Sequence, residues 1–184
     1  MMLPNQIKEK ARNISLMIFD VDGVLTDGTL VYGANGEELK HFNVKDGVGI
    51  KLLQTYGIHV AIISAKESAP LRKRITDLGI KHAYLACKDK LVALNELKSK
   101  LGLEDEHIAY CGDDVIDLKV MKQIGLAMAP NDAYEMVKKH SDYVTHAMGG
   151  KGVAREVADV LLSSRMDLER AYIKAMLPEF EDKK

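Results

Sequence analysis

Short apolar runs alternate with longer amphipathic segments along most of the chain. The runs are rich in Ile, Val, Leu, Met and Ala, and they have the length and composition of buried strands. The segments between them repeat apolar residues at the three- and four-residue spacing of one helix face. The predicted strands are 15–20, 58–63, 82–86, 107–111, 125–129 and 142–146, and the predicted helices are 46–56, 67–78, 89–101, 114–123, 132–139, 153–163 and 166–176.

Strands that alternate with helices predict a parallel sheet with helices on both faces. This is a doubly wound, Rossmann-like α/β fold, in which right-handed crossovers bring the carboxyl ends of the strands to one edge of the sheet. A length of 184 residues fits one domain over 1–184, and we find no repeat or linker that divides the chain.

One segment, residues 28–42, departs from the alternation. It reads as two strands around Gly33-Ala34-Asn35-Gly36, and these residue types tolerate the positive φ angles of a hairpin turn. We therefore expect a small β-hairpin flap directly after the first strand. The stretch 166–184 is expected to form a helix with a frayed, charged end.

Composition and charge argue against several classes of protein. The 26 basic and 27 acidic residues leave a net charge of −1, which gives no electrostatic support for binding nucleic acid or an anionic membrane. Cys87 and Cys111 are too few for a disulfide framework, and the six histidines lack the spacing of a zinc site. The chain shows no signal-peptide core and no membrane span, so we expect a soluble cytoplasmic protein.

Three aspartates follow the ends of two predicted strands. Asp20 closes the first strand and Asp22 comes two residues later, in FDVDGVLTDG, while Asp113 follows a later strand, in YCGDDVID. Ligands bind at this edge of open parallel sheets, so we expect the three carboxylates to converge there. They would repel one another without a cation, and Mg²⁺ suits a few carboxylates plus water and phosphate. The pattern therefore predicts a magnesium site.

The same edge carries the groups that phosphoryl transfer requires, namely a nucleophile, cations or donors for the phosphoryl oxygens, and a proton for the leaving group. Asp20 can attack phosphorus, and Asp22 can act as general acid and then as base. Ser64 ends the second core strand, and Lys90 begins a helix, where both can hold phosphoryl oxygens. Asp117 lies four residues after Asp113 and is a candidate to hold a metal-bound water or to orient Lys90.

Two further aspartates have simpler interpretations. Asp114 is expected to begin a helix, and Asp27 is expected to form a turn before the hairpin. A DxD pattern alone is common in loops. A more specific signal is the order in which four features follow one another. A strand precedes DVDGV, a second strand ends at a Ser, a Lys begins a helix, and a further strand precedes GDDVID.

In these motifs the chain resembles the haloacid dehalogenase superfamily of phosphotransferases. The superfamily's four signatures appear in order, as DVDGV at 20–24, Ser64, Lys90 and GDDVID at 112–117. The resemblance covers nearly the whole chain. It implies that Asp20 is nucleophile and metal ligand, that Asp22 is acid/base and binds metal through its backbone carbonyl, and that Asp113 completes the metal site. Ser64 and Lys90 would bind the transferring phosphoryl group.

Further segments, NGEELKHFNVKDGVGI, SDYVTH and GGKGVAREV, resemble the 3-deoxy-D-manno-octulosonate 8-phosphate phosphatases of that superfamily. The implied substrate is this eight-carbon 2-keto sugar acid phosphate, and the implied product feeds lipopolysaccharide synthesis. The chain has Ala65-Lys66 where that group usually has Gly-Arg, and it has Lys151 where an Arg or another residue is often found. Since Arg and Lys bind carboxylates differently, a nine-carbon sialate- or nononate-type keto acid phosphate stays an open alternative.

Lys66, Arg74 and Lys151 are candidate contacts for the sugar acid. For Lys66 and Arg74 the alternative is a solvated helix face, and for Lys151 it is an ordinary exposed loop position. A phospho-accepting receiver module is an alternative of another class. Receivers lack an acid/base two residues after the phosphorylated aspartate, so Asp22 argues against it.

No cap domain fits into either interval where the superfamily often carries one. The interval between Thr26 and Ser64 holds the hairpin and one helix, and the interval between Lys90 and Asp113 holds one helix and one strand. A monomer would therefore leave its site open to water. An isolated apolar hairpin also needs cover, and the resemblance implies a homotetramer in which a neighbouring subunit lines each site. The alternative is a hairpin that folds back on its own domain.

Overall fold

A six-stranded parallel sheet forms the centre of the computed structural model, which describes residues 3–34 and 36–176. The strand order is β5-β4-β1-β6-β7-β8. This confirms the doubly wound α/β fold that the sequence pattern predicts. The strands are β1 (Leu16–Phe19), β4 (His59–Ile63), β5 (His82–Tyr84), β6 (Ile108–Cys111), β7 (Leu126–Ala129) and β8 (Tyr143–Val144).

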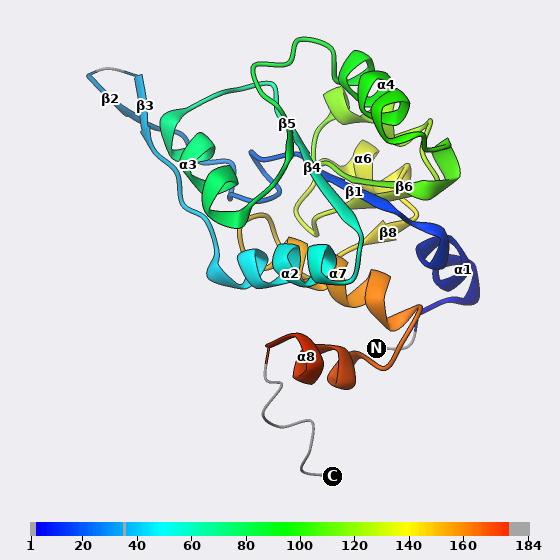
Figure 1. Cartoon of the computed structure of the whole chain (residues 1–184). Helices are drawn as coiled ribbons and strands as arrows, with labels where there is room; N and C mark the ends of the chain where they lie inside the picture. Colours follow the sequence, from blue (N-terminus) through cyan, green and yellow to red (C-terminus); the bar gives the residue numbers. More distant parts are fainter. Residues whose placement is uncertain (1–2, 35, 177–184) are drawn as a thin grey trace.

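Helices cover both faces of this sheet (Figure 1). One face packs against α1 (Asn5–Asn13), α2 (Val44–Thr55), α3 (Ala69–Leu78) and α7 (Val153–Ser163), and α8 (Leu168–Met176) lies outside α2 and α7. The other face packs against α4 (Lys90–Leu101), α5 (Leu118–Met121) and α6 (Glu135–Lys139). Two short 3₁₀ turns, η1 (Asp105–His107) and η2 (Val115–Asp117), lie in the connections on either side of β6.

Strand β1, at the centre of the sheet, is apolar at every position because both of its faces are buried. In β1, Met17 and Phe19 belong to the core under α1, α2 and α7, while Leu16 and Ile18 belong to the core under α4. All four side chains are fully buried. A strand buried on both faces reads as a continuous apolar run rather than an alternating one, which is the pattern seen in the sequence.

The predicted hairpin is present as β2 (Val31–Gly33) and β3 (Gly36–Leu39), which pair antiparallel. It projects away from the body of the molecule (Figure 1). Asn35, in the predicted turn, and residues 177–184 of the predicted C-terminal segment lie outside the described residues.

The largest local differences between the observed and the expected elements concern α1 and the segment 114–123. Helix α1 has no counterpart in the prediction, because it buries only Ile7 and Ala11 and leaves a sparse apolar pattern. The helix expected over 114–123 is instead divided into η2 and α5. The described helices are each too short or too polar to cross a lipid bilayer.

The direction of winding reverses between β1 and β6. From β1 the chain moves outward through β4 to β5, then returns to β6 on the other side of β1 and continues to β7 and β8. In open α/β sheets, ligands bind at such a switch point, beyond the carboxyl ends of the strands. Asp20 directly follows β1, and Asp113 follows β6 after one glycine.

Candidate active site

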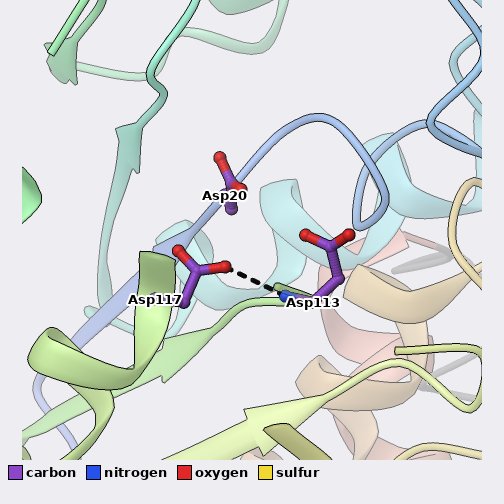
Figure 2. Close-up of side chains that lie close together, drawn as sticks. All are labelled: Asp20, Asp113 and Asp117. Atoms are coloured by element: carbon purple, nitrogen blue, oxygen red, sulfur yellow. Dashed lines mark hydrogen bonds between the residues drawn. The ribbon is translucent and has the colours of Figure 1, made fainter. Parts of the chain in front are cut away.

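The carboxyl ends of β1 and β6 hold two of the predicted carboxylates side by side. Phe19 pairs with Cys111 in the parallel register, and the backbone N–H of Asp20 donates to the Cys111 carbonyl at 3.0 Å. Carboxylate oxygens of Asp20, Asp113 and Asp117 all lie within 4.8 Å of one another (Figure 2). The predicted convergence of three carboxylates is therefore present for Asp20 and Asp113, but the third member of the cluster is Asp117 and not Asp22.

Two glycines leave room for these carboxylates. Gly23 has φ +84°, and a Cβ atom there would lie 2.0 Å from Oδ2 of Asp113. A Cβ atom on Gly112 would lie 2.5 Å from Cγ of Asp117. Both positions exclude a larger side chain because such a contact is far inside van der Waals distance.

Lys90 lies between two of the acids. It is the first residue of α4, whose N-cap Asp89 accepts a hydrogen bond from the Leu91 backbone N–H at 3.0 Å. The buried Lys90 ammonium lies 2.8 Å from Asp20 Oδ2 and 2.7 Å from Asp117 Oδ1. Burial lowers its pKa, but the two carboxylates outweigh this and raise the pKa above the usual value. Lys90 therefore stays a cation at the site.

Asp117 joins Lys90 to the backbone that carries Asp113. Its Oδ1 accepts from Lys90 and, at 2.6 Å, from the Tyr110 hydroxyl. Its Oδ2 accepts from the backbone N–H groups of Asp113 at 3.1 Å and Asp114 at 3.2 Å. Because both oxygens of this fully buried carboxylate are hydrogen-bonded, its contacts favour orienting Lys90 over holding a metal-bound water. Sequence reasoning missed Tyr110, which is hidden inside an apolar strand.

The two acids that face each other across the switch point have raised pKa values. Burial raises the pKa of Asp20 to about 6, although Lys90 opposes the shift. Burial, followed by the charges of Asp20 and Asp117, raises the pKa of Asp113 to about 7. Crowded carboxylates of this kind are stabilised by a cation, and an all-oxygen donor set fits Mg²⁺.

These shifts predict that Mg²⁺ stabilises the fold more at pH 8 than at pH 5. A carboxyl group whose folded pKa is raised binds more protons when folded, so stability without metal falls as pH rises from about 4 to about 7. A bound Mg²⁺ at 100 times its Kd should raise Tm by about 5–10 °C at pH 8. At pH 5 the protonated acids bind the ion poorly, so the shift should be much smaller.

Thermal melts with Mg²⁺ and with chelator at the two pH values measure this difference. Asp113→Asn serves as the control because it removes a predicted ligand, and it should abolish the shift at pH 8. An equal shift at both pH values would contradict the assignment of these acids to the cation site.

Ser64 lies at the end of β4, the strand next to β1. It is buried, and its Oγ accepts a hydrogen bond from the Lys66 backbone N–H at 3.2 Å. The Lys66 side chain itself is exposed. Beside Lys90 opens a pocket of about 330 Å³, lined by Ala65, Cys87, Lys88, Asp89, Lys90, Ile116 and Lys119.

Arg74, in α3, and Lys151, which follows Gly150, are each linked through neighbouring residues to the loop after β1. The Arg74 guanidinium donates to the Asn43 carbonyl at 3.1 Å, at the start of α2, and Asn43 Nδ2 donates to the Gly150 carbonyl at 3.2 Å. The Gly150 backbone N–H donates to the Val24 carbonyl at 3.0 Å. These contacts connect Arg74 to the loop that carries Asp22 through α2, and they leave the Lys151 side chain exposed.

The two simpler interpretations are confirmed. Asp27 is exposed, and its Oδ1 accepts from the Thr29 backbone N–H at 3.0 Å, as a turn former does. Asp114 caps η2 and accepts from the Val115 backbone N–H.

Asp22 has a partner that sequence reasoning missed. Its carboxylate forms an ion pair with Lys40, at the end of the hairpin, and Lys40 also pairs with Glu37. Nothing in the sequence distinguished Lys40 from other lysines, because the contact crosses from the hairpin to the loop after β1.

Comparison with known proteins identifies similar sequences and structures. Residues 86–157 match the family model of the haloacid dehalogenase-like hydrolases. The chain is 47% identical to a 3-deoxy-D-manno-octulosonate 8-phosphate phosphatase of Salmonella typhi over 90% of its own length and 88% of the relative. It is 46% identical to the crystal structure of a phosphatase of that name from Yersinia pestis, with a TM-score of 0.88 and coverage of 91% and 90% of the two chains.

A third similar structure contains ligands. It is the 3-deoxy-D-manno-octulosonate 8-phosphate phosphatase of Moraxella catarrhalis in complex with magnesium, phosphate and KDO. The identity is 38%, the TM-score is 0.88, and the match covers 97% of this chain and 100% of the other.

Proposed function

Because the chain belongs to the 3-deoxy-D-manno-octulosonate 8-phosphate phosphatase family of the haloacid dehalogenase-like hydrolases, we propose that it hydrolyses that phosphate ester in the cytoplasm. The products are the free sugar acid, a precursor for lipopolysaccharide, and inorganic phosphate. The observation that carries this proposal is the meeting of Asp20, Asp113 and Lys90 at the switch point of the sheet. This arrangement places a nucleophile, Asp20, beside a cation site formed with Asp113 and beside the fixed positive charge of Lys90.

Asp20 is the nucleophile of the first step. Lys90 occupies its Oδ2, which leaves Oδ1 for attack on phosphorus. The bond from phosphorus to the sugar oxygen breaks as the bond to Asp20 forms, and Asp22 gives its proton to the departing oxygen. The result is an aspartyl-phosphate and the free sugar acid.

Asp22 acts in the opposite sense in the second step. Its carboxylate takes a proton from water, the water oxygen bonds to phosphorus, and the bond to Asp20 breaks. Inorganic phosphate leaves, and both aspartates return to their starting states. Ser64 and Lys90 hold the phosphoryl oxygens in both steps, and Asp117 keeps Lys90 in place.

Asp20, Asp113 and the backbone carbonyl of Asp22 are the proposed ligands of Mg²⁺. When bound, the ion neutralises charge on the phosphoryl oxygens. Asp117 belongs to the same carboxylate cluster, but each of its oxygens already accepts two hydrogen bonds. We therefore assign Asp117 to orientation and not to the metal.

Lys66 and Lys151 are proposed contacts for the carboxylate of the sugar acid. Both side chains are exposed. The Lys66 backbone N–H donates to Ser64, and Gly150, next to Lys151, donates to the loop that carries Asp22. Arg74 is the weakest of the three candidates, because its guanidinium donates to Asn43 and lies 5.7 Å from the centre of the Phe42 ring. The nine-carbon alternative draws no support from the relatives, whose names specify the eight-carbon compound.

Phosphate release from the eight-carbon and nine-carbon keto acid phosphates, each with Mg²⁺ and with chelator, tests the proposal. We expect many turnovers per chain, dependence on Mg²⁺, and a kcat/KM at least about 10-fold higher for the eight-carbon compound. A higher value for the nine-carbon compound would overturn the substrate assignment. One stable phosphoaspartate per chain without turnover would favour a receiver module.

We also propose that the protein is a homotetramer in which a neighbouring subunit lines each site. The hairpin exposes large apolar side chains, with Tyr32 at 66% and Leu39 at 56% relative exposure. Surfaces of this kind need cover, and the sites lack a cap from their own chain in the described residues. Light scattering coupled to size-exclusion chromatography should give four times the chain mass, and a monomer mass would exclude this arrangement.

A further inference from the structure

We propose that Lys40 is a positioning residue that holds the Asp22 carboxylate for acid/base catalysis and fastens the hairpin to the catalytic loop. This inference rests on the proposed function, because it assigns a task to Lys40 through the acid/base role of Asp22.

The geometry places one lysine between two carboxylates from different elements. The Lys40 ammonium pairs with Oδ1 of Asp22, in the loop after β1, and with Oε1 of Glu37, in β3. Only 1% of the Lys40 side chain and 9% of the Glu37 side chain are exposed, although both belong to the projecting hairpin. A lysine that is this deeply buried is held in place, because separation from its two carboxylates would leave a buried charge unpaired.

The charge of Lys40 is maintained by these partners. Burial lowers its pKa, but the interactions of the ammonium with the Asp22 and Glu37 carboxylates outweigh that effect and raise the pKa. Among the described side chains, the one that donates a hydrogen bond to the Asp22 carboxylate is Lys40. The direction of that carboxylate therefore depends on Lys40 alone among the described side chains.

Direct binding of the substrate by Lys40 is disfavoured by the same facts. Its ammonium is covered and already shared between two carboxylates, so no surface remains for an incoming hydroxyl or carboxylate. A proton donor must lie within hydrogen-bond reach of the leaving oxygen, and small misplacements reduce rates strongly. Lys40 therefore acts on the reaction through Asp22.

Lys40→Ala tests this inference in the full-length protein. We expect kcat to fall about 10–100-fold, while KM and the Mg²⁺ concentration for half-maximal activity change less than about 3-fold. Lys40→Arg keeps a cationic side chain that can donate to both carboxylates, and it should recover a substantial part of the kcat that Lys40→Ala loses. Lys45→Ala is the matched control, because Lys45 is an exposed lysine of the same region and should leave kcat unchanged.

A double-mutant cycle distinguishes positioning from a general structural effect. If Lys40 acts through Asp22, Lys40→Ala should reduce kcat by less than about 2-fold in the Asp22→Asn background. An equal loss in both backgrounds, an unchanged kcat in the single variant, or a rise in KM with unchanged kcat would each overturn the inference. Should the alanine variant fail to fold, Lys40→Met keeps the aliphatic stem and Glu37→Gln loosens the cluster from its other side.

The wild-type enzyme separates this inference from the function on which it rests. If wild type releases no phosphate from either keto acid phosphate, the proposed function fails. If wild type turns over and Lys40→Ala turns over equally, only the role of Lys40 fails.

Discussion

Asp20→Asn abolishes phosphate release, with kcat reduced at least about 10⁴-fold at saturating substrate and Mg²⁺. The amide has nearly the same shape as the carboxylate but cannot supply the anionic oxygen that bonds to phosphorus. The fold should persist, because Lys90 keeps its ion pair with Asp117. Steady-state phosphate release measures the loss, and circular dichroism with a thermal melt verifies the fold.

Asp27→Asn is the matched control for that variant. Asp27 lies in the same loop but is exposed, and an Asn side chain can still accept from the Thr29 backbone N–H. Its kcat should stay within about 3-fold of wild type, as is usual for surface substitutions of this type. Activity of Asp20→Asn above about one per cent of wild type would mean that another group attacks phosphorus.

Gly23→Ala reduces kcat/KM by at least about 10³-fold and weakens Mg²⁺ binding. The new methyl group would lie 2.0 Å from Oδ2 of Asp113, so this carboxylate must leave its position beside Asp20. Gly23 also has φ +84°, which strains any other residue. Kinetics at increasing Mg²⁺ concentration should show a raised half-saturation point together with the loss of rate.

Gly28→Ala distinguishes the steric clash with Asp113 from the strain of a positive φ angle. Gly28 has φ +79° in the same loop, but a Cβ atom there would meet only ordinary contacts at 3.7 Å or more. It carries the conformational strain alone, so its stability should fall by about 1–2 kcal/mol while its kcat/KM stays within about 5-fold of wild type. Equal losses for the two variants would show that strain, and not contact with Asp113, causes the effect.

Much of the fold was predictable because it depends on local patterns. The central strands are apolar runs buried on both faces, apart from the exposed His59 that begins β4, and the predicted strands over 15–20, 58–63 and 107–111 contain β1, β4 and β6. Where burial is slight, as in α1 with only Ile7 and Ala11 buried, the pattern was too weak to recognise.

The reacting groups were predictable for a related reason. Strand ends are visible in the sequence, and a parallel sheet gathers them at one edge. Asp20, Ser64 and Asp113 each follow such a strand, and Lys90 begins the helix that follows another. Their identity as candidates therefore needed only the order of elements.

The links between these groups were not predictable. Lys40 reaches Asp22 across 18 residues, and Lys90 reaches Asp117 across 27. The Tyr110 hydroxyl donates a hydrogen bond to Asp117, although Tyr110 lies in a strand whose sequence pattern indicates only an apolar core. No spacing rule pairs such residues, because the contacts depend on how separate elements pack.

The sequence by itself determined the layered α/β architecture, the hairpin after the first strand, and the placement of Asp20, Asp113 and Lys90 at the sheet edge. Only the tertiary structure decided which oxygen of Asp20 pairs with Lys90, that both oxygens of Asp117 are occupied, and that Lys40 holds Asp22. The physical reason is one of scale. Periodicity places a residue on an element and an edge, whereas hydrogen bonds depend on separations of about 3 Å that packing alone sets.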